Sequence, residues 1–300
     1  MVNTKILSGK DLSMRIKEDL KVEIERLNGR GVYPKLVVVI VGENPASQIY
    51  VRNKEKACKE VGIMSETIYL PENISQPLLI NKIKELNYRA DVNGILVQLP
   101  LPKHLNEEDV INAIDPKKDV DAFHPINVGK IMIGNYEFLP CTPAGIMELI
   151  KESNIDITGK NCVVVGRSNI VGKPMSMLLL HSNGTVTICH SKTENLEEII
   201  KSADILVVAI GKPHFVNGSM IKEGAVIIDV GINRLEDKKI CGDVDTESCM
   251  GIAGAITPVP GGVGPMTITM LLKNTIKSAI LKEEKERYQQ MVEECLELID

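Results

Sequence analysis

The sequence predicts an α/β protein with two α/β domains flanking a cleft, the second a Rossmann-type NAD(P)-binding domain with a mostly parallel sheet. Short apolar runs typical of strands alternate with helical patterns along most of the chain, which favours parallel sheets covered by helices. A strand, a tight turn and a helix start follow one another at Val163–Pro174, as in a dinucleotide site. Because this turn comes late in the chain, the residues before it require a separate α/β unit.

The elements follow in order from apolar periodicity. Apolar residues recur at helical spacing from Leu12 to Leu27, and a strand follows. The strands predicted in chain order are Leu36–Val41, Thr67–Leu70, Gly94–Val97, Cys162–Val165, Val186–Cys189, Ile205–Ala209 and Ala225–Val230.

Prolines mark the predicted domain boundaries. Two prolines at Leu139–Pro143 precede a helix that starts at about Pro143, and Pro265 stands at the start of a long C-terminal helix. We therefore expect residues 1–140 with 272–300 to form one domain and residues 141–271 to form the Rossmann domain.

The end of this C-terminal helix carries its own pattern. From about Lys282 it is rich in Glu and Lys, and Met291, Val292, Cys295 and Leu296 recur at helical spacing. We expect an amphipathic tail helix that docks on a neighbour.

Composition excludes several classes of function. The net charge of −5, with no long basic run, argues against a nucleic acid partner. The seven cysteines form no C-x-x-C pair and the five histidines show no ligand spacing, so we expect reduced thiols and no metal. The N-terminus has no apolar signal-like region and no apolar run is long enough to span a bilayer. We therefore expect a cytoplasmic protein with no membrane partner.

The turn after Val163–Val165 indicates which dinucleotide binds. Gly166 and Gly172 suit a tight turn and close helix packing, although Ser168 stands where a Rossmann fingerprint has its second glycine. NAD enzymes place an acid at the end of the next strand, whereas here Ser191 and a lysine follow it, and Arg167 lies in the turn. A cation and a hydroxyl suit a 2′-phosphate, which favours NADP over NAD.

The catalytic candidates lie in the first domain. Asn44 is a predicted helix N-cap, and Tyr50 and Lys54 follow at i, i+4 on one helix face. Such a pair is usually surface packing, but Gln98 ends the strand Gly94–Val97, at the edge where α/β sheets bind ligands. In Lys118–Asp121 the two acids lie on opposite sides of an extended segment, so at most one is expected to face a given ligand.

The order of these motifs resembles one family. Tyr50 with Lys54, the block Gly94–Pro102, Lys118–Asp121, Pro140–Pro143, Gly166–Ser168, His190–Ser191 and Pro258–Pro265 occur in the order found in the bifunctional methylenetetrahydrofolate dehydrogenase/methenyltetrahydrofolate cyclohydrolase family. The resemblance covers essentially the whole chain. One departure is Ala122, where the family usually has glycine, and alanine tolerates a positive φ poorly.

The resemblance implies oxidation of 5,10-methylenetetrahydrofolate by hydride transfer to NADP, followed by hydrolysis of the product to 10-formyltetrahydrofolate. It also implies that the protein forms a homodimer. It implies catalytic roles for Lys54, Tyr50, Gln98 and Asp121, with Lys54 exchanging protons and Asp121 holding the pterin. The cofactor-binding residues it implies are Gly166, Arg167, Ser168, Ser191, Ile232 and Thr142. The substrate-binding residues it implies are Tyr50, Gln98, Leu99, Asp121, Pro260, Gly261 and Gly262.

The residues considered without the family resemblance leave two other functions open. A two-domain dehydrogenase acting on a small hydroxy or amino acid would also need a cation such as Lys54, but it would leave Tyr50 and Gln98 without a purpose. A non-catalytic NADP-sensing module would not require the set Lys54, Gln98 and Asp121.

Overall fold

The structure is a computed structural model that describes residues 2–236 and 239–297. The chain divides into two compact units, one formed by Met1–Arg15 with Asn127–Met270 and the other by Ile16–Ile126 with Leu271–Asp300. We name them by their main sheets, the six-stranded unit and the three-stranded unit.

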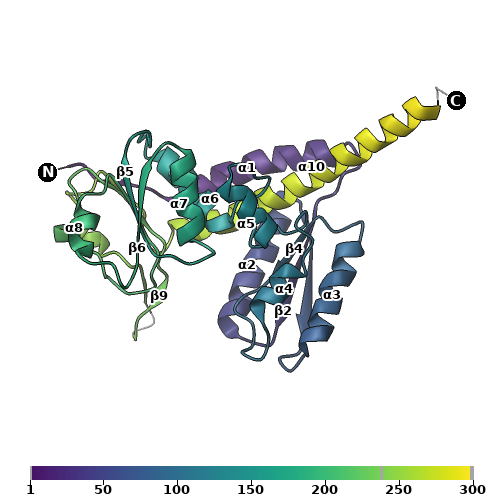
Figure 1. Cartoon of the computed structure of the whole chain (residues 1–300), viewed down its shortest axis with the longest axis horizontal. Coiled ribbons are helices and arrows are strands. Elements are labelled where there is room, and N and C mark those ends of the chain that lie inside the picture. Colours follow the sequence, from purple (N-terminus) through teal and green to yellow (C-terminus); the bar gives the residue numbers. More distant parts are fainter. Residues whose placement is uncertain (1, 237–238, 298–300) are drawn as a thin grey trace. The chain divides into compact units, whose positions relative to one another are not determined.

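The three-stranded unit contains a parallel sheet in the order β3-β2-β4. Its elements are β2 (Lys35–Val41), α2 (Pro45–Val61), β3 (Met64–Leu70), α3 (Gln76–Tyr88), β4 (Gly94–Val97) and α4 (Glu107–Asn112). Alternate residues of β2 and β4 pack with Leu79 and Ile83 of α3, and Figure 1 shows α2 and α3 on opposite sides of the sheet. The β-branched strand β2 lies in the middle because both of its faces are covered.

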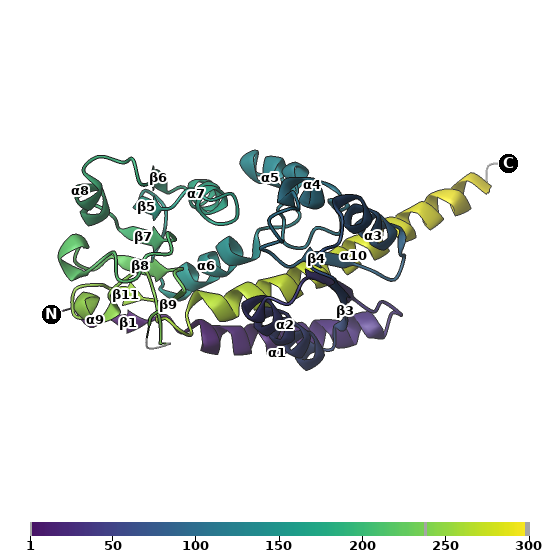
Figure 2. The same ribbon diagram turned by 90° about the horizontal axis from the view of Figure 1, so that it is seen from below.

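The six-stranded unit contains a sheet in the order β1-β11-β8-β7-β5-β6, in which every pairing is parallel, and Figure 2 shows the strands stacked in this order. Its strands are β1 (Lys5–Ile6), β5 (Asn161–Val165), β6 (Thr185–Cys189), β7 (Ile205–Val208), β8 (Val226–Asp229) and β11 (Ala255–Ile256). Because β6 and β7 lie on opposite sides of β5, the strand order reverses at β5, which is where doubly wound sheets bind ligands.

The remaining elements are helices and one small hairpin. They are α1 (Gly9–Asn28), α5 (Pro125–Met132), α6 (Cys141–Glu152), α7 (Gly172–His181), α8 (Leu196–Lys201), the 3-10 turn η1 (Gly218–Met220), α9 (Thr246–Cys249), α10 (Val263–Glu297) and the antiparallel pair β9 (Asn233–Arg234) and β10 (Ile240–Cys241). All seven strands expected from apolar runs exist, with ends within three residues of the predicted ones.

The unit boundaries differ from those expected at residues 140 and 271. Residues 1–15 group with the six-stranded unit because β1 pairs with β11 along Lys5 and Ile6. Part of α5 does so as well, and His181 of α7 hydrogen-bonds the carbonyl oxygen of Ile131 at 2.8 Å. These contacts join segments that are far apart in the sequence, and the periodicity of apolar residues does not predict such contacts.

Candidate active site

Helix α2 positions the first two candidates. The side-chain oxygen of Asn44 accepts hydrogen bonds from the backbone N–H groups of Ala46 (3.0 Å) and Ser47 (3.1 Å). This cap fixes the first turn of the helix, so the predicted N-cap is confirmed. Tyr50, 43% exposed, and half-buried Lys54 then follow one turn apart.

The structure brings Lys54 to Gln98. Lys54 Nζ donates to Gln98 Oε1 at 3.0 Å, and Gln98 Nε2 donates to the carbonyl oxygen of Leu99 at 2.6 Å. The backbone N–H of Gln98 donates to Val39 O at 2.8 Å, which ties the residue to the sheet. The amide of Gln98 is therefore oriented on one side by the backbone carbonyl of Leu99 and presents its oxygen to Lys54 Nζ. This pair lies at the carboxyl end of β4, where parallel sheets bind ligands.

The two acids after Lys118 differ in their surroundings. Asp119 is 2% exposed, and its Oδ2 accepts the backbone N–H of His124 at 2.8 Å, so this carboxylate holds the following turn. Asp121 is half-buried. Ala122 is buried with a φ of 57°, so the backbone keeps the left-handed conformation expected where the family has glycine.

The predicted nucleotide turn follows β5 and is tightly packed. Gly166 has a φ of 135°, and a Cβ there would lie 2.4 Å from the carbonyl oxygen of Ala209. A Cβ on Gly172 would lie 2.2 Å from Gly166 O, so the start of α7 approaches the turn closely. Ser168 Oγ accepts the N–H of Val171 at 3.2 Å, so a hydroxyl closes the turn where the fingerprint has glycine. Both glycines are required by backbone contacts rather than by chain flexibility.

The polar groups at this edge suit a phosphorylated dinucleotide. Arg167, Ser168 and Ser191 are exposed after β5 and β6, and no acid stands in the segment His190–Lys192. Ile232 is 52% exposed after β8. A guanidinium and hydroxyls without a carboxylate fit an NADP 2′-phosphate better than the free ribose hydroxyl of NAD.

The remaining predicted residues of this unit are Thr142 and the loop Pro260–Gly262. Thr142 Oγ1 and Thr267 Oγ1 are 3.0 Å apart and share a hydrogen bond. The loop at Pro260–Gly262 is held by Lys10, whose backbone N–H donates to Gly261 O at 2.9 Å. A Cβ on Gly9 would lie 1.8 Å from Gly262 O, so the start of α1 requires glycine there.

Sequence reasoning missed a buried pair of acids that organises the loops at this edge. Asp229, at the end of β8, accepts the backbone N–H groups of Gly231, Asp243 and Val244, each at 2.9 Å. Burial raises the pKa of Asp229 to about 6, while those three donors act in the opposite direction. Two acids within apolar, glycine-rich stretches (Asp229 before Val-Gly, Asp243 after Cys-Gly) were the available signal.

Asp243 binds the loop after β7. Its carboxylate is fully buried and accepts the N–H groups of Ile210 (2.7 Å), Gly211 (2.9 Å) and Lys212 (2.8 Å), and the side-chain amide of Asn233 (2.9 Å). This loop follows β7, the strand next to β5. Asp243 therefore fixes the backbone conformation of a loop at the carboxyl end of the sheet.

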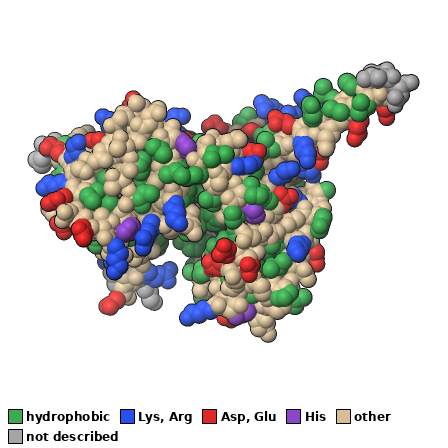
Figure 3. All heavy atoms as spheres, in the orientation of Figure 1, with side chains coloured by type: hydrophobic (Ala, Val, Ile, Leu, Met, Phe, Trp, Pro, Cys, Tyr) green, Lys and Arg blue, Asp and Glu red, His purple; other side chains and the backbone are tan. Residues whose placement is uncertain are grey.

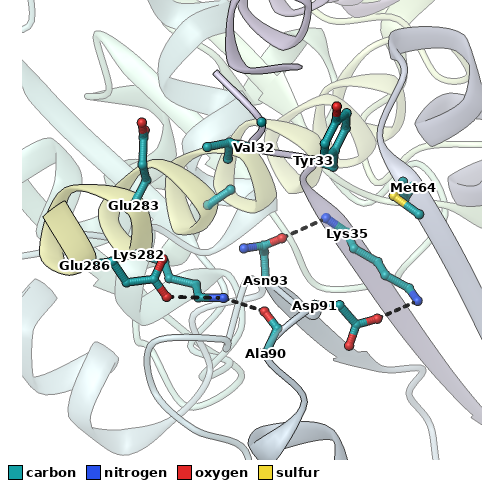
Figure 4. A pocket seen from close by; sticks show the side chains of 12 residues that line it. Val32, Tyr33, Lys35, Met64, Ala90, Asp91, Asn93, Lys282, Glu283 and Glu286 are labelled. Carbon is teal, nitrogen blue, oxygen red and sulfur yellow. Dashed lines mark hydrogen bonds and ion pairs between the residues drawn. The ribbon is translucent and has the colours of Figure 1, made fainter. Parts of the chain in front are cut away.

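A pocket of about 340 Å³ lies at the opposite, amino end of the three-stranded sheet (Figure 4). Its charged groups satisfy one another: Lys35 pairs with Asp91 at 2.9 Å, and Lys282 pairs with Glu286 at 3.6 Å and donates to the carbonyl of Ala90. None of the predicted catalytic residues lines this pocket.

The described part of the chain has neither a metal-binding cluster nor a membrane-spanning helix. Among the described residues, no group of three or more His, Cys, Asp or Glu side chains is arranged to hold a metal ion. Over the same residues, no helix has the length and apolar character needed to cross a membrane.

Comparison with known proteins identifies the family. The tetrahydrofolate dehydrogenase/cyclohydrolase catalytic domain matches residues 7–121, and the NAD(P)-binding domain of the same family matches residues 140–283. The bifunctional protein FolD of Acetivibrio thermocellus is 66% identical over 281 residues, which is 94% of this chain and 99% of that protein.

Solved structures agree with this match. The bifunctional FolD enzyme of Campylobacter jejuni is 50% identical with a TM-score of 0.91, covering 93% of this chain and 99% of that one. The Trypanosoma brucei FolD, solved with NADP and an inhibitor, is 37% identical with a TM-score of 0.90, covering 94% of this chain and 99% of that one. The chain therefore belongs to the tetrahydrofolate dehydrogenase/cyclohydrolase family: it oxidises 5,10-methylenetetrahydrofolate with an NAD(P) cofactor and hydrolyses the methenyl product to 10-formyltetrahydrofolate.

Proposed function

We propose that Lys54 is the proton-transferring residue of the hydrolysis, that it helps to position the substrate for the oxidation, and that Gln98 orients it. The observation that carries this proposal is the 3.0 Å hydrogen bond from Lys54 Nζ to Gln98 Oε1 at the carboxyl end of β4. The hydrogen bond from Gln98 Nε2 to Leu99 O fixes the orientation of the side-chain amide. The amide oxygen of Gln98 then points at Lys54 and holds Nζ in place by accepting its hydrogen bond. The other positions on Nζ stay available for substrate or water.

The oxidation needs positioning more than it needs a base. A nitrogen lone pair of the substrate expels hydride from the bridging carbon, and NADP, when bound, accepts that hydride. Tyr50, on the same helix one turn before Lys54 and partly exposed, stacks on the folate ring. The hydroxyl and ring of Tyr50 thus limit how the substrate can lie beside Nζ.

The hydrolysis needs an activated water at the methenyl carbon. Lys54 Nζ, in its neutral form, takes a proton from that water and returns it to the departing nitrogen. Asp121 hydrogen-bonds the amino and ring-nitrogen donors of the pterin. Leu99 and the loop Pro260–Gly262 complete the substrate contacts.

In the six-stranded unit, NADP is bound along the carboxyl ends of β5 and β6. Gly166 and Ser168 form the turn, and Arg167 with Ser191 binds the 2′-phosphate. Ile232 and Thr142 contact the remainder of the cofactor. The exposed guanidinium, the two serine hydroxyls and the missing strand-end acid support this assignment.

Membership of this family supports proposals for the domain roles, the assembly and the location. We assign folate binding to residues 1–140 with 272–300 and NADP binding to residues 141–271. The compact units of the structure divide at different places, after residues 15, 126 and 270. We further propose that the protein forms a homodimer and acts in the cytoplasm.

Replacing Lys54 tests the catalytic assignment. Lys54→Met is expected to lower the cyclohydrolase kcat at least about 100-fold, the usual worth of a proton-transfer group. Lys56→Met, on the exposed side of the same helix, is the matched control and should retain activity. The assignment is refuted if Lys54→Met hydrolyses methenyltetrahydrofolate at the rate of the control while both proteins remain folded.

Replacing Arg167 tests the cofactor assignment. A charge-assisted bond to phosphate contributes about 1.5–3 kcal/mol, so Arg167→Ala should raise the KM for NADP roughly 10- to 100-fold and leave that for NAD nearly unchanged. Lys173→Ala, also exposed and a few residues away in α7, is the control. An equal loss for both cofactors would show that Arg167 does not read the 2′-phosphate.

A further inference from the structure

The last turns of α10, Glu284–Glu297, form a helix that none of the activities above uses; we call this segment the tail. Every residue of the tail is exposed, and Figure 1 shows it extending beyond the other elements of the three-stranded unit. The family match ends at residue 283, so the tail also lies outside the part shared with the family. The expected docking on a neighbour is therefore not made by any described element of this chain.

The tail carries a continuous apolar stripe. Tyr288, Met291, Val292, Cys295 and Leu296 recur at i, i+3, i+4, i+7 and i+8, the spacing of one face of an amphipathic helix. Tyr288, Met291, Val292 and Leu296 are 68%, 55%, 41% and 60% exposed, and Figure 3 shows hydrophobic side chains uncovered along this part of the chain. A stripe of this kind on a solvated helix requires a partner to bury it.

Charges beside the stripe differ between the two halves of the tail. The first half contains two bases, Lys285 and Arg287, and two acids, Glu284 and Glu286. All charged residues of the second half are acids, Glu293, Glu294 and Glu297. Among the described residues, no ion pair engages Lys285 or Arg287. At 3.6 residues per turn, Arg287 and Glu294 border the same side of the stripe, and Lys285 lies in line with the stripe at its N-terminal end.

We propose that the tail pairs with the tail of a second copy of this chain as an antiparallel two-stranded coil. When the midpoints of the two tails coincide, between Gln290 and Met291, Arg287 of each copy lies opposite Glu294 of the other. Parallel pairing would instead bring the three glutamates in the second half of one tail close to the same three glutamates of the other tail, and this repulsion is destabilising.

The geometry of α10 makes this pairing feasible. The tail is about 21 Å long at 1.5 Å per residue, which is short for an isolated helix. It continues from a part of α10 buried in the protein, where Ile276 and Ala279 are 1% exposed, so the helix is already nucleated. Association then buries apolar surface without the cost of forming the helix.

Oligomer mass tests whether the stripe associates. In sedimentation velocity of the full chain, the wild type should form an assembly with twice as many copies as the variant Met291→Glu/Val292→Glu. Gln290→Glu, on the opposite face of the same turn, is the matched control and should keep the wild-type mass. Equal masses for the wild type and the double variant, with dehydrogenase activity showing that both are folded, overturn the proposal.

Charge exchange and cross-linking test the antiparallel direction. Arg287→Glu should weaken the association at least tenfold, and Arg287→Glu/Glu294→Arg should restore it. Cys295 of the two copies would be roughly 13 Å apart along the axis, beyond disulfide reach, so the native chain should not cross-link under mild oxidation. Met291→Cys/Cys295→Ser should cross-link, and Gln290→Cys/Cys295→Ser should not. Cross-linking through native Cys295, or equally through positions 290 and 291, overturns the antiparallel arrangement.

Discussion

The buried carboxylate of Asp243 gives the most quantitative prediction. It accepts four hydrogen bonds, from three consecutive N–H groups at Ile210–Lys212 and from the side chain of Asn233, at 2.7–2.9 Å. Asp243→Ala leaves all four donors without an acceptor. An unsatisfied buried donor costs about 1–3 kcal/mol, and we take about 1 because the loop is partly exposed and water can reach it. The expected loss of unfolding free energy is therefore about 4 kcal/mol.

The conservative variant separates the hydrogen bonds from the packing. Asp243→Asn keeps one of the two oxygens, and thus about two of the four bonds, so its expected loss is about 2 kcal/mol. Urea denaturation followed by circular dichroism measures both values. Asp245→Ala is the control, because within the described part of the chain that neighbouring carboxylate accepts a single N–H, from Ser248 at 3.4 Å. Losses below about 1 kcal/mol for Asp243→Ala, or equal losses for the two Asp243 variants, would refute this reasoning.

Two further predictions concern charge and thiols. The Arg89 guanidinium, and then Lys35, lower the pKa of Glu66 to about 2, so the stabilisation by its carboxylate is complete above about pH 4.5 and is lost as the pH falls toward 2. Glu66→Gln should therefore be less stable than the wild type at pH 7, by about 1 kcal/mol after allowance for solvent screening, and equally stable near pH 2; a difference that persists in acid would contradict this. In dilute native protein one thiol per chain, Cys295, should react rapidly with a maleimide, because the other six are buried and burial raises the pKa of Cys58 to about 12; mass spectrometry that finds a second fast thiol would contradict it.

Local signals in the sequence predicted much of the fold. The apolar runs gave all seven longer strands, and the pair Asn44 and Pro45 gave the start of α2, because caps and buried strands depend on neighbouring residues. The two-residue strands β1 and β11 escaped prediction. Their stability comes from the pairing of Lys5–Ile6 with Ala255–Ile256, and segments this short carry no periodicity of their own.

The candidate site divides in the same way. The i, i+4 spacing of Tyr50 and Lys54, and Gln98 at a strand end, were visible in the sequence and stood out through the family resemblance. The hydrogen bond between Lys54 and Gln98 was not visible, since it depends on how α2 packs beside β4. Asp229 and Asp243 were missed because their partners are backbone groups, which every residue has and no side-chain motif reveals.

By itself the sequence determined the α/β class, the strand-turn-helix at Gly166 and the amphipathic pattern of the tail, because each depends on residues within a few positions of one another. The tertiary structure alone decided which residues share a site: it joined Lys54 to Gln98, tied the loop after β7 to Asp243, moved residues 1–15 into the six-stranded unit and left the tail exposed. The physical reason is that these contacts join segments separated by many residues, and their free energy comes from burial and hydrogen bonds that exist only after the chain has folded.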